Sequence, residues 1–73
     1  MEDIKDICKQ RETRFRHIYP ESDIYIIDTL VFPNKDNKAI IQAGFPDGEF
    51  FFIVDEHSVS SSFNSLDEAK RHL

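Results

Sequence analysis

Two apolar segments dominate the middle of the chain, residues 38–45 and 49–55, and three turn-forming residues separate them, Pro46, Asp47 and Gly48. Proline presets the first position of a turn, aspartate is tolerated at the second, and glycine supplies a positive φ at the third. The pattern therefore predicts two antiparallel strands joined by a three-residue hairpin loop.

A loop of this length fixes which residues of the two strands lie opposite one another. Phe45 is expected opposite Glu49, and Ile41 opposite Ile53, on one face of the sheet, because side chains alternate along a strand. The other face is then expected to carry Ile40, Gln42, Gly44, Phe50, Phe52 and Val54. Small antiparallel sheets commonly expose one polar face to water, whereas both faces of this hairpin are apolar.

The residues before the hairpin predict a helix and then a strand. Within residues 2–17 the apolar positions recur at spacings of three and four, which is typical of an amphipathic helix, and Pro20 disfavours its continuation. Residues 22–32 are rich in β-branched and aromatic side chains and predict the first strand. Its alternation is interrupted at Asp28, which is compatible with a bulge. The polar residues 33–37 suit a turn into the next strand.

The residues after the hairpin predict a short terminal helix. Ser65 and Glu68 match a capping box, which favours a helix over residues 66–73. Residues 59–63 fit either a short fourth strand, which we prefer, or an extended lead-in to this helix. The predicted order is an N-terminal helix, a three- to four-stranded antiparallel β-meander and a short C-terminal helix. This is a single small α+β domain spanning residues 1–73.

Two helices can cover a sheet in two ways. If they lie on opposite faces, no unusual apolar surface remains. If both lie on one face, as the layer rules favour, the domain has two layers and its other face carries a large apolar patch. A second copy of the chain, or a different protein, would then cover that patch. This hypothesis assigns the interface to Ile40, Gln42, Phe50, Phe52 and Val54.

Composition narrows the class of protein. The 73 residues are 40% hydrophobic, which is enough for a core, and the net charge of -5 argues against non-specific binding to nucleic acid. Cys8 is the single cysteine, so the chain cannot form an internal disulfide or a cysteine-rich zinc site. The first ten residues are charged throughout, which is typical of neither a signal peptide nor a membrane span. We therefore expect a cytoplasmic protein.

The sequence contains little that indicates catalysis. Both glycines, Gly44 and Gly48, belong to the hairpin, and neither a phosphate-binding loop nor a nucleophile motif occurs. Cys8 lies on the apolar side of the first helix, where cysteine usually serves as packing. We expect no enzyme activity, no metal or cofactor site, and no catalytic residue.

The hypothesis that follows is a non-enzymatic interaction or regulatory module that forms a homodimer, or binds another protein, through an apolar sheet face. Small acidic domains of this kind are compatible with bacterial or phage accessory proteins. The alternative is a single-stranded nucleic-acid binder that stacks bases on a Phe-rich sheet. A secondary basic patch for an acidic partner is assigned to Arg11, Arg14, Arg16 and His17. A surface exposed to solvent and paired with neighbouring acids explains the same patch.

Overall fold

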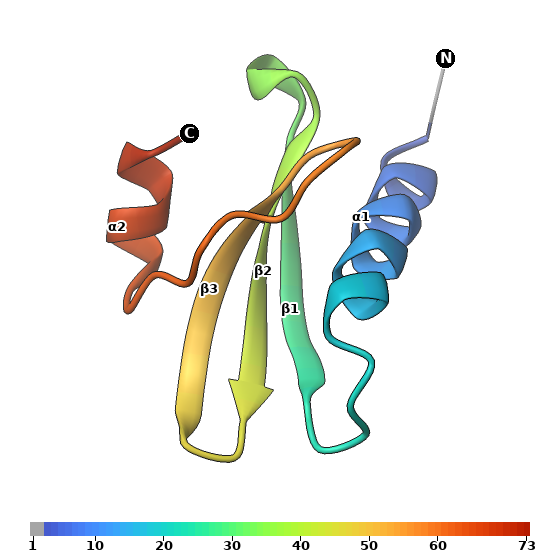
Figure 1. Ribbon diagram of the computed structural model, residues 1–73. Helices are drawn as coiled ribbons and strands as arrows, with labels where there is room; N and C mark the ends of the chain where they lie inside the picture. The colour runs from blue at the N-terminus through green and yellow to red at the C-terminus, as the bar shows by residue number, and fades with distance from the viewer. Residues whose placement is uncertain (1–2) are drawn as a thin grey trace.

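The computed structural model describes residues 3–73. Its helices and strands are α1 (Ile4–Ile18), β1 (Tyr25–Phe32), β2 (Lys38–Phe45), β3 (Gly48–Val54) and α2 (Leu66–Arg71), with a 3-10 turn at Pro33–Lys35. The three strands form one antiparallel sheet in the order β1-β2-β3 (Figure 1). The predicted α+β order is therefore confirmed. The expected helix start at Glu2 lies outside the described residues.

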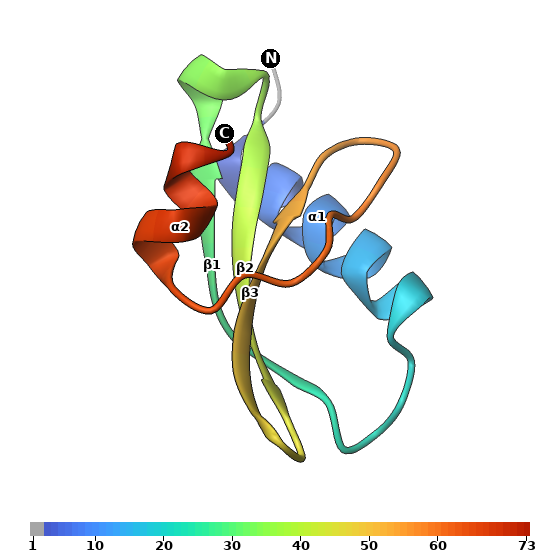
Figure 2. The same cartoon turned by 60° about the vertical axis from the view of Figure 1, so that its left-hand side comes forward.

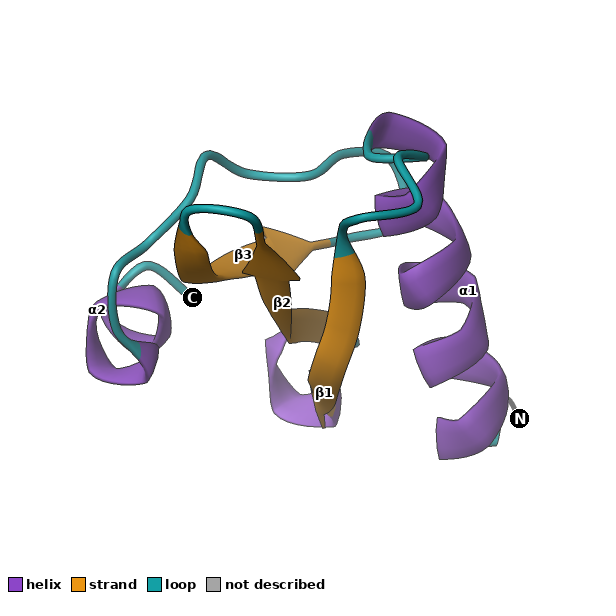
Figure 3. Cartoon of the chain, turned by 90° about the horizontal axis from the view of Figure 1, so that it is seen from below, coloured by secondary structure: helices purple, strands orange, loops and turns teal. Residues whose placement is uncertain are grey.

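The two helices lie on opposite sides of the sheet, as Figures 1 and 3 show. On one side Phe15 of α1 packs against Phe52 of β3, with ring centroids 5.1 Å apart. On the other side Leu66 of α2 lines a small hollow together with Ile40 and Phe51. The molecule thus adopts the arrangement with one helix on each face, in place of the two-layer stacking with both helices on one face.

Each helix begins at a side-chain cap. Asp3 accepts a hydrogen bond from the backbone N–H of Lys5 at the start of α1, and Ser65 accepts one from Glu68 at the start of α2. These caps satisfy amide donors that have no partner inside the helix. The Ser65 half of the predicted capping box is therefore confirmed. Helix α2 has 6 residues and ends at Arg71, so it relies on packing against the sheet rather than on its own hydrogen bonds.

The hairpin register differs from the predicted one by one residue. Phe45 pairs with Gly48, so the loop contains two residues instead of three, and Ile41 pairs with Phe52. Gly48 has a φ of 146°, which lets β3 begin directly after the turn. A shift of one residue moves every β3 side chain to the other face. Phe50, Phe52 and Val54 consequently share the α1 side with Ala43, Ile41 and Ala39.

The main core lies between α1 and the sheet. Its buried members are Phe15, Ile24, Ile41, Ala43, Phe52 and Val54. Phe15 and Val54 are fully buried, and the ring of Tyr19 lies 5.3 Å from that of Phe52. Burying a large apolar side chain stabilises a fold by about 1.5–3 kcal/mol, so this cluster is the principal support of the domain.

Residues 58–63 cover the outer edge of β3 without forming a regular strand (Figure 2). Phe51 and Phe63 exchange backbone hydrogen bonds of 2.9 and 2.8 Å, and the amide of Ser60 donates to the carbonyl of Ile53 at 2.8 Å. The amide of Ile53 donates to the Ser60 hydroxyl instead of a backbone carbonyl. The ladder is therefore interrupted, and the segment is an extended lead-in rather than the preferred fourth strand.

Candidate interaction surface

The exposed apolar side chains concentrate on β1. Within residues 3–73 the exposed large hydrophobic residues are Ile4, Ile18, Tyr25, Ile27 and Leu30. The last three belong to β1 and are 57%, 42% and 38% exposed. We call Tyr25, Ile27 and Leu30 the β1 strip. Helix α2 packs mainly against β2 and β3, and its Leu66 lies in a small hollow that Leu30 also lines, so it covers β1 only in part.

Local structure explains why the β1 strip is irregular. Tyr25 pairs with Gly44 and Leu30 pairs with Ile40, which places both side chains on the α2 side of the sheet. The register shifts between Ile26 and Asp28, so Ile27 is the extra residue of a bulge at the position where the alternation is interrupted. The Tyr25 ring lies directly over Gly44, where an added Cβ would come within 2.4 Å of it.

The residues assigned to the interface from the sequence do not form one surface. Ile40 and Gln42 lie on the α2 side, whereas Phe50, Phe52 and Val54 lie on the α1 side. Ile40, Phe52 and Val54 are 2% exposed or less. The expected exposed face combined the two sides because it rested on the wrong register.

The two half-buried members of that set have partners within the chain. The Gln42 side-chain amide donates to the Glu49 carboxylate at 3.0 Å. The ring of Phe50 packs edge-on against Phe45 with centroids 5.7 Å apart. The Phe-rich strand is therefore packed into the molecule rather than displayed as a platform.

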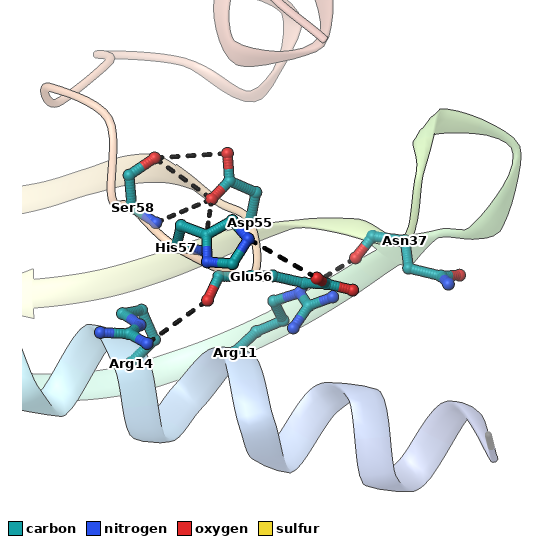
Figure 4. A network of polar contacts seen from close by, with 7 residues as sticks. All are labelled: Arg11, Arg14, Asn37, Asp55, Glu56, His57 and Ser58. Carbon is teal, nitrogen blue, oxygen red and sulfur yellow. Dashed lines mark hydrogen bonds and ion pairs between the residues drawn. The ribbon is translucent and has the colours of Figure 1, made fainter.

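The arginines of the expected basic patch donate to backbone carbonyls of loops. Arg11 Nε lies 3.0 Å from the carbonyl oxygen of Asn37, and Arg14 Nη2 lies 3.3 Å from that of Glu56 (Figure 4). Arg16 binds the carbonyls of Tyr19 and Ile24. Arg11 is only 3% exposed, and His17 is exposed. These residues therefore do not form one basic surface, because the three arginines connect α1 to three different loops.

The Asp55 carboxylate organises the loop whose Glu56 carbonyl accepts a hydrogen bond from Arg14. Asp55 Oδ1 accepts hydrogen bonds from the backbone amides of His57 at 2.8 Å and Ser58 at 2.7 Å (Figure 4). These bonds lower the pKa of Asp55 below its ordinary value, and the bond from His57 has the largest effect. Partial burial of the carboxylate acts in the opposite direction and raises the pKa. The same turn presents the Glu56 carbonyl to Arg14.

An open groove of about 1010 Å³ lies between α1 and the Asp55 turn. Its charged lining residues are Asp6, Lys9, Arg11, Arg14, Glu56 and the histidines His17 and His57. Nε2 of His57 lies 3.8 Å from the carboxylate of Glu56, and both side chains are exposed. No group of three or more His, Cys, Asp or Glu side chains within residues 3–73 is arranged to hold a metal ion. The mixed charges give the groove no single ligand preference.

Cys8 is a half-buried free thiol. Burial, and then the nearby negative charges of Glu12 and Asp28, raise the pKa of this thiol above 9.0. A thiol becomes a good nucleophile when its pKa is lowered, so the surroundings of Cys8 suit packing rather than catalysis.

Comparisons with known protein families, with curated proteins and with solved structures found no match to this chain. No helix in the described part of the chain is both long and apolar enough to cross a lipid bilayer.

Proposed function

We propose that this chain is a small non-enzymatic interaction or regulatory module that forms a homodimer through the β1 strip. The observation that supports the proposal is the concentration of exposed apolar side chains on one strand that α2 covers only in part. Isologous two-fold dimers are the commonest oligomers, so a second copy is the simplest cover for such a surface. With one cysteine, Cys8, the chain has no disulfide framework of the kind that is typical of small secreted domains, which is compatible with a cytoplasmic location.

The size of the exposed surface indicates a weak dimer. The accessible surface of the chain, 4894 Å², is close to the area of about 4700 Å² that is expected for a folded monomer of 8.6 kDa. A standard interface removes about 800 Å² from each partner, and three partly exposed side chains supply less than this. We therefore expect an equilibrium between monomer and dimer, with a dissociation constant on the order of micromolar or weaker.

Light scattering across a concentration series from micromolar to millimolar tests the proposal. The average mass of the wild type is expected to rise from 8.6 kDa towards twice that value. Ile27→Asp is expected to remain monomeric, because it places a charge in the β1 strip. Ile18→Asp is the matched control, since Ile18 is 52% exposed but lies at the end of α1. Circular dichroism verifies that both variants are folded.

Two outcomes would contradict the proposal. If the wild type stays at the monomer mass over the whole concentration series, the proposed homodimer is refuted. Equal weakening by Ile18→Asp and Ile27→Asp would show that added charge, rather than the β1 strip, controls association.

Single-stranded nucleic-acid binding on the Phe-rich sheet has less support. Phe52 is 2% exposed and Phe50 packs on Phe45, so base-stacking surface is scarce. The two hypotheses also respond to salt in opposite ways. Binding to phosphates weakens steeply as salt is added. Association of two chains with a net charge of -5 each is expected to strengthen, because salt screens their repulsion.

A further inference from the structure

The two edges of the sheet differ. Residues 58–63 occupy the backbone groups of β3 that point away from β2, through the bonds of Phe51 and Ile53. The outer edge of β1 has no such covering segment within the described part of the chain. An uncovered edge presents backbone donors and acceptors to any strand that can align with it.

The register shows which β1 residues present those groups. A two-residue hairpin closes on a hydrogen-bonded pair, here Phe45 with Gly48, and bonded pairs then alternate along the ladder. Alternate β2 residues therefore bond towards β1, so Asp28 and Leu30 use their backbone groups on β2. The amides and carbonyls of Thr29 and Val31 consequently point to the open edge.

The open part of this edge is short. The bulge at Ile27 interrupts the strand on one side, and the 3-10 turn at Pro33–Lys35 ends it on the other. The Asp28 carboxylate also accepts a hydrogen bond of 2.9 Å from the Thr29 amide. Bulges and charged side chains are devices that limit edge-to-edge association. The usable segment is therefore residues 28–32.

We propose that two copies of the chain pair antiparallel along residues 28–32, about a two-fold axis beside Leu30, to form one continuous six-stranded sheet. This proposal rests on the proposed homodimer and identifies its interface. Leu30 then lies opposite Leu30 of the second copy, and Thr29 exchanges hydrogen bonds with Val31 of the second copy. Both α1 helices lie on one face and both α2 helices on the other.

The pairing is compatible with a two-fold axis and places no like charges directly opposite each other. Side chains directly opposite each other must share a face, and Leu30, Asp28 and Phe32 all lie on the α2 side. Asp28 then faces Phe32 of the second copy, rather than its own equivalent, in a row that continues to Lys38. In this pairing the Asp28 carboxylate no longer accepts the hydrogen bond from the Thr29 amide. It lies in the same cross-strand row as Lys38 of the second copy. A lone peptide on so short an edge gains few hydrogen bonds, whereas a second copy also brings its own β1 strip.

Disulfide trapping tests this register. Leu30 residues on the axis form a non-hydrogen-bonded pair, with Cα atoms expected about 4.5 Å apart, which suits a disulfide. In a Cys8→Ser background, L30C is expected to form a covalent dimer in a glutathione redox buffer. Y25C is the control, because Tyr25 is more exposed but lies far from the axis. Non-reducing electrophoresis is expected to show at least tenfold faster crosslinking of L30C than of Y25C.

A second measurement does not depend on a new thiol. Val31→Pro removes an outward amide, which an edge strand tolerates, and is expected to give a folded monomer by light scattering. If this variant fails to fold, hydrogen exchange of the Val31 amide in the wild type tests the same pairing. That amide is expected to exchange at least tenfold more slowly at millimolar than at low micromolar concentration.

The outcomes separate the two proposals. A wild-type dimer with equal crosslinking of L30C and Y25C, or with no concentration dependence in Val31 exchange, would overturn the edge pairing and leave the homodimer standing. A wild type that is monomeric at every concentration would overturn both proposals. Fast L30C crosslinking together with concentration-dependent Val31 protection would establish the six-stranded sheet.

Discussion

Among residues 3–73, Arg11 is the one charged residue that is buried, and its removal is expected to be costly. The guanidinium donates from Nε to the carbonyl of Asn37, and 3% of the residue is exposed. Asp36 and Asn37 both adopt left-handed backbone geometry, with φ of 59° and 57°. Such conformations cost free energy and need support from their surroundings. Arg11 therefore holds a strained connection between β1 and β2 against α1.

The size of the effect follows from the contacts. A hydrogen bond from a charged donor contributes about 1.5–3 kcal/mol, and Arg11→Ala also loses the packing of the aliphatic stem. We expect a total loss of about 3 kcal/mol. A domain of 73 residues has roughly 4–11 kcal/mol of stability. The variant thus loses a large fraction of the whole, and its melting temperature is expected to fall by more than about 10 °C.

Urea denaturation followed by circular dichroism measures the loss. Arg11→Met retains much of the stem and removes the donor, so it separates the two contributions and is expected to cost about 2 kcal/mol. Arg14→Ala is the matched control on the same helix, because it also donates to a loop carbonyl but is more exposed. It is expected to cost less than about 1 kcal/mol. A cost for Arg11→Ala within about 0.5 kcal/mol of that control would refute the reasoning.

Three further predictions concern Gly44, Asp55 and Cys8. Gly44→Ala is expected to destabilise the fold by about 1–3 kcal/mol, because its Cβ would meet the Tyr25 ring. In a Tyr25→Ala background the same change is expected to cost almost nothing, which a thermal double-mutant cycle measures. Asp55 has a lowered pKa in the folded state. Its contribution to stability is therefore complete above about pH 3.8, its ordinary value, and is lost as the pH falls through the lower folded value. The stability difference between wild type and Asp55→Asn is expected to shrink over that range in urea titrations. A constant difference would contradict this. Alkylation of Cys8 by iodoacetamide is expected to have a pH midpoint above 9.0 in the folded protein, and a midpoint below 9.0 would contradict the account of its surroundings.

The element order was predictable because local chemistry determines it. Ser65 caps α2 with a hydrogen bond to the amide three residues on, and Asp28 marks the bulge of β1 as an interruption of the alternation. Each of these signals lies within a few residues of the structure that it specifies. Non-local information was needed for the rest.

The hairpin register was not predictable from the turn residues alone. Pro46 cannot adopt the positive φ that the common two-residue hairpin turns require, so the turn residues by themselves favour the three-residue loop. The choice depends on which side of β3 meets α1, and the observed register places Phe52 and Val54 in the core beside Phe15. The hydrogen-bond partners of the arginines could not be predicted from the sequence for a similar reason. Arg11 and Arg14 find carbonyls 26 and 42 residues away along the chain.

The position of the β1 strip follows from the order of the chain. Residues 58–63 and α2 come directly after β3, so they cover the edge of β3 and the α2 side of β2 and β3. Within the described residues, α1 precedes β1, and it packs on the other face through Phe15. Within the described part of the chain, β1 is therefore covered only in part on the α2 side, where Leu66 lies in the hollow that Leu30 also lines. In the proposed dimer, β1 of the second copy pairs along the open edge of β1, and its Leu30 lies beside Leu30 of the first copy on the α2 side.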